Sequence, residues 1–199
     1  MYGGDNQEYV VMFYMNGTTQ PGAWYPSTDG ILWVDSLKPY IRTTNVIVCP
    51  SVRGGSLRGG FGIAMNHPEI GGWRTDPSKI SAVKHPSETI PYADTGLIAN
   101  HTERNPDLWI ETKDEQALYY RTPTNQDYYS DDPERPVNRH GQRCNSGFMD
   151  GHGAAIRVSA MGLQYFPGKG PAGQAATGNP RWGSGNNGIY DSRWMWDLE

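Results

Sequence analysis

The chain has 199 residues and a mass of 22.1 kDa, which suits one domain with a hydrophobic core of its own. Its 25 Gly and 15 Pro exclude a helix bundle, whereas 12% aromatic residues and a net charge of only −4 exclude a disordered chain. A pI near 5.7 with scattered basic residues argues against a nucleic-acid partner. We therefore expect a compact, β-rich domain with long loops.

The first fifty residues predict one short helix and one strand. Residues 1–9 are too short for an independent helix and are consistent with the end of one. Apolar residues at helical spacing predict a short amphipathic helix in 31–41, which Pro39 ends. The β-branched residues of 45–49 predict a strand that Pro50 closes.

The middle of the chain predicts two strands followed by a long excursion. Residues 61–65 and 89–93 each have the composition of a short strand, and Asp94 marks the end of the second. Residues 96–138 are polar and largely without period, so we predict a loop-rich insertion with one short strand at 118–120. Insertions of this length often carry a binding surface.

The clearest local signal is a β-hairpin near residue 150. The pair Asp150-Gly151 separates the strand-like segments 146–149 and 152–158. Because Gly accepts positive φ, Asp-Gly favours a type I′ turn between two strands.

Two interpretations of His140 stay open. As part of an enzyme, it would be a general base oriented by Asp94 or by Asp150. The sequence contains no Gly-x-Ser-x-Gly nucleophile elbow, however. In the alternative interpretation Asp150 accepts backbone N–H groups of its own turn, and His140 hydrogen-bonds to a buried loop.

Metal and disulfide sites also have two interpretations each. The acidic residues of one loop are a candidate calcium site or simply a solvated surface; they are Asp127, Asp131, Asp132 and Glu134. Cys49 and Cys144 could form a disulfide in an oxidising compartment or remain buried thiols. Their spacing fits no metal motif, and the other histidines have no ligand-like spacing with them, so we expect no structural zinc site.

Several sequence blocks, in order, resemble one known family. They are MYGGDNQEY (1–9), WVDSLKPYI with VIVCPS (33–41 and 46–51), FGIAMN (61–66), VKHPSETIPYADT (83–95) and RHGQRCNSGFMDGH (139–152). The order and spacing resemble the prepilin-type, pseudopilin-like proteins named for a His, a nine-residue gap and an Asp-Gly pair. The resemblance covers nearly the whole chain except residues 96–136 and the Gly-rich C-terminal part.

This resemblance implies an α+β, pilin-like antiparallel β-sheet over a single domain, 1–199, with a long N-terminal helix of which residues 1–9 are the remnant. The family's leader and hydrophobic helix are not in this sequence, so we expect a truncated domain with one uncovered sheet face and an exposed apolar patch. The matching motif residues would be structural rather than catalytic; they are Asp94, His140, Asn145, Asp150 and Gly151. The resemblance also leads us to predict that the strand ending at Asp94 lies near the hairpin of 145–150, with His140 beside both.

The function implied is that of a non-enzymatic structural subunit in a type II secretion or type IV pilus-like assembly. Its partners would be other pseudopilin subunits and the secretion machinery, with no nucleic acid and no required cofactor apart from the calcium considered above. The missing helix would anchor it in the inner membrane, with this domain in the periplasm or outside. Two alternatives remain: a secreted carbohydrate-binding or hydrolytic β domain, and a calcium-stabilised adhesin-like module.

Overall fold

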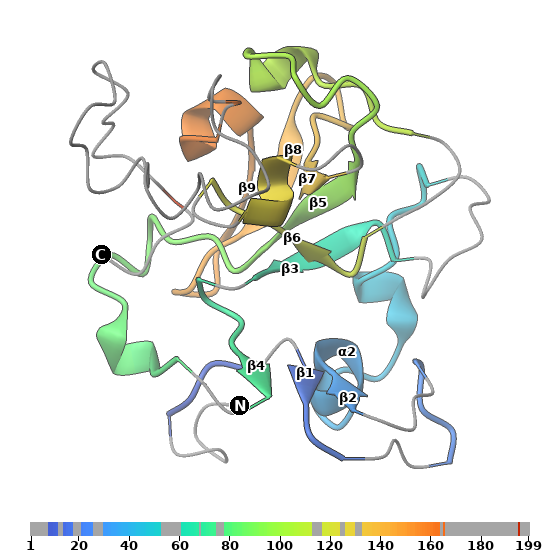
Figure 1. Ribbon diagram of the computed structural model, residues 1–199. Coiled ribbons are helices and arrows are strands. Elements are labelled where there is room, and N and C mark those ends of the chain that lie inside the picture. Colours follow the sequence, from blue (N-terminus) through green and yellow to red (C-terminus); the bar gives the residue numbers. More distant parts are fainter. Residues whose placement is uncertain are drawn as a thin grey trace.

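A six-stranded mixed sheet, a smaller three-stranded sheet, one short α-helix and five 3-10 turns make up the described part of the chain (Figure 1). The computed structural model describes residues 8–11, 14–17, 21–25, 30–52, 61–67, 69–74, 78–112, 117–123, 126–129, 133–163, 165 and 195. This content agrees with an α+β or mostly β class. Among these residues, no helix has the length and apolar character needed to cross a membrane.

The large sheet has the strand order β6-β3-β5-β8-β9, and β7 also pairs with β5. Neighbouring strands are antiparallel except β3 and β6, which run parallel. The sheet is therefore mixed, whereas a purely antiparallel sheet was expected. The strands are β3 (Ile63–Asn66), β5 (Tyr92–Leu97), β6 (Tyr119–Tyr120), β7 (Glu134–Pro136), β8 (Cys144–Gly147) and β9 (Gly153–Ile156). Both β6 and β7 come from the segment predicted to be an insertion.

Strand β5 lies at the centre of this sheet. It begins at Tyr92 and continues to Leu97, so Asp94 lies inside the strand. The prediction that Asp94 marks the end of this strand is wrong. The extension follows from a partner that local sequence cannot show, because β7 pairs with residues 95–97. Asp94 is thus a buried carboxylate in a central strand.

The smaller sheet has the order β2-β1-β4 and lies next to the helix α2 (Figure 1). Its strands are β1 (Tyr14–Met15), β2 (Ile31–Leu32) and β4 (Trp73–Arg74), and α2 spans Trp33–Leu37. The helix predicted in 31–41 is therefore present but shorter, since its first two residues pair as a strand. It ends before Pro39, as predicted.

The strand predicted over 45–49 is wrong. Residues Thr44–Val46 form a 3-10 turn, and only Val48 makes a bridge, to Gly62. An antiparallel strand continuing from the Val48–Gly62 bridge would place Asn45 opposite Met65, which already pairs with Tyr119 of β6, so the edge of β3 has no room for the full predicted strand.

Two tight turns shape the region around β8. Gly141 and Gln142 have φ of 58° and 61°, and His140 and Arg143 exchange both backbone hydrogen bonds across them. This is the geometry of a type I′ turn. The type I′ turn predicted at Asp150-Gly151 is wrong, because Phe148 and His152 enclose three residues and only Gly151, at φ 93°, has positive φ.

Apolar side chains form one cluster on each face of the large sheet. Successive residues of a strand point to opposite faces, so Ala93 enters one cluster and its neighbour Tyr92 packs against the other. The first cluster includes Ile90 and Val158, and the second includes Trp33 of α2. At the N-terminal end of the described chain, Tyr9 forms a bridge with Lys79, so this residue of the predicted helix remnant is not helical; residues 1–7 lie outside the described residues.

Candidate functional site

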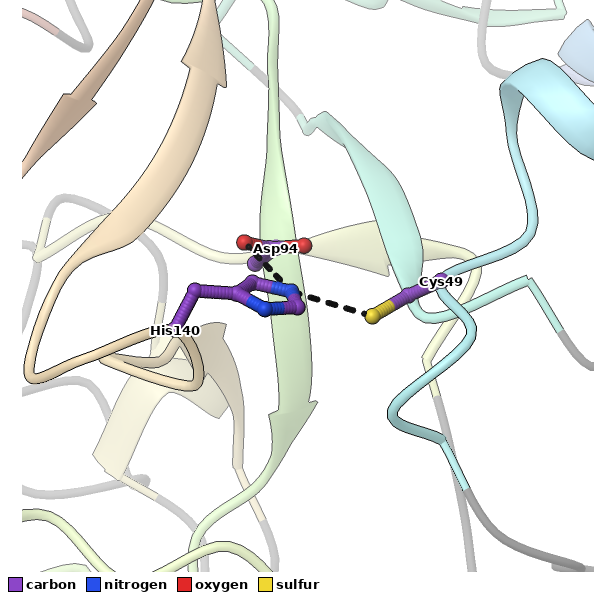
Figure 2. Close-up of side chains that lie close together, drawn as sticks. All are labelled: Cys49, Asp94 and His140. Atoms are coloured by element: carbon purple, nitrogen blue, oxygen red, sulfur yellow. Dashed lines mark hydrogen bonds and ion pairs between the residues drawn. The ribbon is translucent and has the colours of Figure 1, made fainter.

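Three side chains from distant parts of the chain converge beside β5. Cys49, Asp94 and His140 each offer a ligand atom, and these three atoms lie within 4.8 Å of one another. The Nε2 atom of His140 is 3.2 Å from the Sγ of Cys49 and 3.6 Å from the Oδ2 of Asp94. Figure 2 shows the imidazole reaching from its loop toward both partners. We call these three residues the Cys-Asp-His cluster.

Asp94 owes its position to a gap in the pairing of β5. Both β7 and β8 run antiparallel to β5: β8 pairs with residues 92–93 and β7 with residues 95–97. The chain between β7 and β8 loops out over 137–143, so neither strand pairs with residue 94. At this gap the N–H of Asn145 donates to the side-chain Oδ2 of Asp94 at 2.7 Å, and Val137 donates its N–H to the Asp94 carbonyl at 2.9 Å. The carboxylate therefore takes the place of a missing backbone acceptor.

His140 is placed by the type I′ turn that closes the looped-out segment. The backbone of His140 is held by two hydrogen bonds with Arg143, so the imidazole projects from a tight, defined turn. Its side chain is 28% exposed, whereas those of Cys49 and Asp94 are almost completely buried. The cluster is consequently open to solvent on the His140 side only.

An ion-pair network balances the buried charge of Asp94. Arg139 approaches Asp94 at 3.5 Å and binds the carboxylate of Glu111 through Nη2 at 2.5 Å and Nε at 3.1 Å. Burial raises the pKa of Asp94, and the hydrogen bond from Asn145 and the charge of Arg139 oppose that rise. The same guanidinium donates to the carbonyls of Gly62, which precedes β3, and of Thr95 in β5.

The geometry separates two kinds of chemistry. In a Cys–His relay, the thiol and the orienting carboxylate would contact different ring nitrogens. Here both contact Nε2 of His140, so one nitrogen would have to serve both neighbours. Convergence of sulfur, nitrogen and oxygen on one point is instead what a metal ion requires.

The predicted neighbourhood of Asp94 is confirmed. Strand β5 pairs with β8 of the hairpin, and Asp94 contacts both Asn145 and His140. Asp150 and Gly151 lie at the other end of β8, in the exposed turn. Of the two candidate partners of His140, the structure selects Asp94.

Asp150 behaves as the structural interpretation predicted. Its Oδ1 accepts the backbone N–H of His152 at 3.1 Å and contacts Nδ1 of that ring at 2.6 Å. These hydrogen bonds lower the pKa of Asp150. Cys49, in contrast, is a member of the cluster that the sequence analysis did not connect with His140.

The remaining site predictions have different outcomes. Cys49 and Cys144 are both free, buried thiols in the structure, with no disulfide. Burial raises the pKa of Cys144 to about 12, which marks an unreactive thiol. Of the calcium candidates, Glu134 lies in β7 and pairs with Arg121 at 3.2 Å, while the side chain of Asp127 and all of Asp131 and Asp132 lie outside the described residues.

An apolar groove of about 500 Å³ adjoins the Cys-Asp-His cluster. It crosses β3, β5, β8 and β9, and the helix α2 forms one wall. The two sites meet because Ile63 and Asn145, which flank Asp94 on the neighbouring strands, line the groove. The rest of the lining is Trp33, Leu37, Ile41, Val46, Ile47, Tyr92, Ser146, Gly147, Gly153, Ala154 and Ala155. The family resemblance leads us to expect an exposed apolar patch on one face of the sheet.

Comparison of the chain with models of known protein families, with curated proteins and with solved structures finds no match. The apolar groove and the Cys-Asp-His cluster are therefore the features of this chain that bear on its function.

Proposed function

We propose that this chain is the globular domain of a non-enzymatic, pseudopilin-like structural subunit of a type II secretion or type IV pilus-like assembly. A hydrophobic helix N-terminal to the domain would anchor it in the inner membrane and hold the domain in the periplasm or outside the cell. Its partners would be other subunits of the same kind and the secretion machinery.

The observation that carries this proposal is the apolar groove on the large sheet. Its floor contains small residues, Gly147, Gly153 and Ala155, which let another backbone approach the sheet closely. Its walls contain the large side chains of Trp33 and Tyr92. A groove lined by small residues and by large apolar side chains suits an apolar helix, whose burial there would be favourable at roughly 25 cal/mol per Å².

The groove gives less support to a carbohydrate-binding or hydrolytic domain. Its described lining contains no carboxylate, although glycoside hydrolysis needs a facing pair. Asp94 and Glu111 are two carboxylates that share one partner, since both bind Arg139. They serve the interior of the fold and do not face the groove as a pair.

The anchoring part of the proposal can be tested in the host cell. The chromosomal copy of the gene would be tagged at its 3′ end, and the product would be fractionated and sequenced from its N-terminus. We expect a membrane-bound product whose processed N-terminus begins an apolar helix. A cytosolic product with no such helix would contradict the proposal.

A groove-filling substitution tests the assembly part. Ala155 is exposed and lines the groove, so Ala155→Trp fills the groove without disturbing a buried position. Because overpacking costs about 1–3 kcal/mol, we expect roughly tenfold less subunit in cross-linked assemblies. The matched control is Ile110→Trp, at a 61% exposed residue outside the groove, which should assemble normally. Equal assembly of both variants would show that the groove has no part in it.

A further inference from the structure

We propose that the Cys-Asp-His cluster is a zinc site with three protein ligands and a fourth position open to solvent. Its ligand atoms are Cys49 Sγ, Asp94 Oδ2 and His140 Nε2. Thiolate, imidazole and carboxylate are all established zinc ligands, and three protein ligands leave room for one water molecule. The inference does not depend on the proposed function, since it concerns a different set of atoms.

The distances between the ligand atoms are close to those a zinc ion needs. Bond lengths of about 2.0–2.3 Å at tetrahedral angles place ligand atoms about 3.4–3.6 Å apart. The sulfur and nitrogen of Cys49 and His140 are 3.2 Å apart, and the nitrogen and oxygen of His140 and Asp94 are 3.6 Å apart. The sulfur and oxygen lie within 4.8 Å, so shifts of about 1 Å or less complete the geometry.

The local charges also suit a divalent cation. Among the described residues, Arg139 is the cation at this site, and it is shared between Glu111, through two hydrogen bonds, and Oδ1 of Asp94 at 3.5 Å. Glu111 and Asp94 together carry one negative charge more than Arg139 supplies, and Oδ2 of Asp94 faces His140. When zinc binds, the Cys49 thiol releases its proton to solvent, and the two negative ligands balance the 2+ charge of the ion.

Access and support for such an ion are both present. The 28% exposure of His140 provides a path from solvent, whereas Cys49 and Asp94 are buried and pre-positioned. Asp94 is further oriented by the N–H of Asn145, which fixes the carboxylate from outside the ligand set. Zinc would tie together three segments more than 40 residues apart, so its main effect would be on stability.

The experiment uses the purified full chain, freed of metal with a chelator and then supplied with zinc. We expect one zinc per chain by mass spectrometry of the desalted protein. We also expect a melting temperature higher by roughly 5–10 °C when free zinc exceeds its Kd a hundredfold. Cobalt in place of zinc should give the charge-transfer absorption of a thiolate ligand.

Matched variants separate this site from casual binding. Cys49→Ser and His140→Gln should lose the zinc-induced rise in melting temperature and the cobalt–thiolate absorption. Cys144→Ser, at the other thiol, and His152→Gln, at a histidine that contacts Asp150 instead, should retain both.

Two results would overturn the zinc site. The first is a full chain that takes up less than a tenth of an equivalent of zinc. The second is uptake that persists in Cys49→Ser and His140→Gln. If either variant fails to fold, the cobalt spectrum of the unmodified chain decides, because a spectrum without thiolate absorption excludes Cys49 as a ligand.

Discussion

Arg135 shows how a single charged residue can be part of a core. Its side chain is buried, and its guanidinium lies 4.1 Å from the ring centre of Tyr128 and 4.6 Å from that of Trp109. It donates to the backbone carbonyls of His101 and Tyr128. Aromatic faces and carbonyl oxygens thus stabilise a cation without a water shell. The aromatic content seen in the sequence is used here for packing and for cation binding.

Gly62 is the residue at which we expect the strictest backbone requirement. Its φ is +69°, and an added Cβ would lie 2.9 Å from the Cβ of Cys49 and collide with Val52. Since both the conformation and the space exclude a side chain, Gly62→Ala should lower the free energy of unfolding by at least about 2 kcal/mol. Urea denaturation followed by fluorescence would measure this loss.

Gly151 is the control for that substitution. Its φ is +93°, but nothing lies within 4 Å of the position that a Cβ would take. Gly151→Ala should therefore cost only the conformational strain, about 1 kcal/mol. Equal losses in the two variants would mean that crowding near Cys49 contributes nothing.

At the scale of elements, one side chain connects two of the short 3-10 turns. Asp107 in η3 (Pro106–Leu108) accepts hydrogen bonds from Ser159 Oγ at 2.7 Å and Ser159 N at 3.1 Å, both in η5 (Val158–Met161). Asn138 adds a third hydrogen bond at 2.8 Å. One carboxylate thus connects two turns and the loop after β7.

This arrangement predicts a specific acid sensitivity. Partial burial would raise the pKa of Asp107, but the hydrogen bonds from Ser159 and Asn138 outweigh it and lower the pKa below its usual 3.8. Because the pKa is lower in the folded state, the stabilisation is complete above about pH 4 and is lost as the pH falls through the folded value. Asp107→Asn should lower the free energy of unfolding by about 1 kcal/mol at pH 7 and by less at pH 3.

Urea denaturation at both pH values would check the Asp107 prediction. Glu88→Gln, at an exposed residue, is the control and should change stability little at either pH. A loss in Asp107→Asn that is the same at pH 7 and pH 3 would contradict the assigned role of the charged carboxylate.

At the scale of the whole molecule, the end of the chain returns to the first apolar cluster. Met195 packs against that cluster, accepts the N–H of Ile90 at 2.5 Å and donates its own N–H to Met161 at 3.2 Å. Its neighbours Trp194 and Trp196 lie outside the described residues. Met195 is the position in this part of the chain where the contact is defined.

Removing the Met195 side chain should therefore weaken the whole domain. Met195→Ala at this partly buried position should lower the free energy of unfolding by about 1–2 kcal/mol, at the low end of the range for methionine truncation. Ile110→Ala, at an exposed residue, should change it by less than about 0.5 kcal/mol. Thermal unfolding of both variants would measure the difference, and equal melting temperatures would contradict this role.

Local sequence was enough to place the short helix before Pro39, the strands β3 and β6 and the hairpin near residue 150, because turn chemistry and side-chain periodicity act over a few residues. That Asp94, His140 and the hairpin lie together was expected from the resemblance of ordered sequence blocks to a known family, and not from local patterns.

Tertiary structure alone decided the length of β5, the parallel pairing of β6, the loss of a strand over 45–49 and the presence of Cys49 beside His140. Each depends on which edge of a strand is already occupied or on segments more than 40 residues apart. Edge occupancy and long-range proximity are properties of the folded sheet, so no local pattern of residues encodes them. For the same reason, the Cys-Asp-His cluster could not be recognised from the sequence, because its three members have no motif spacing and meet only in the folded sheet.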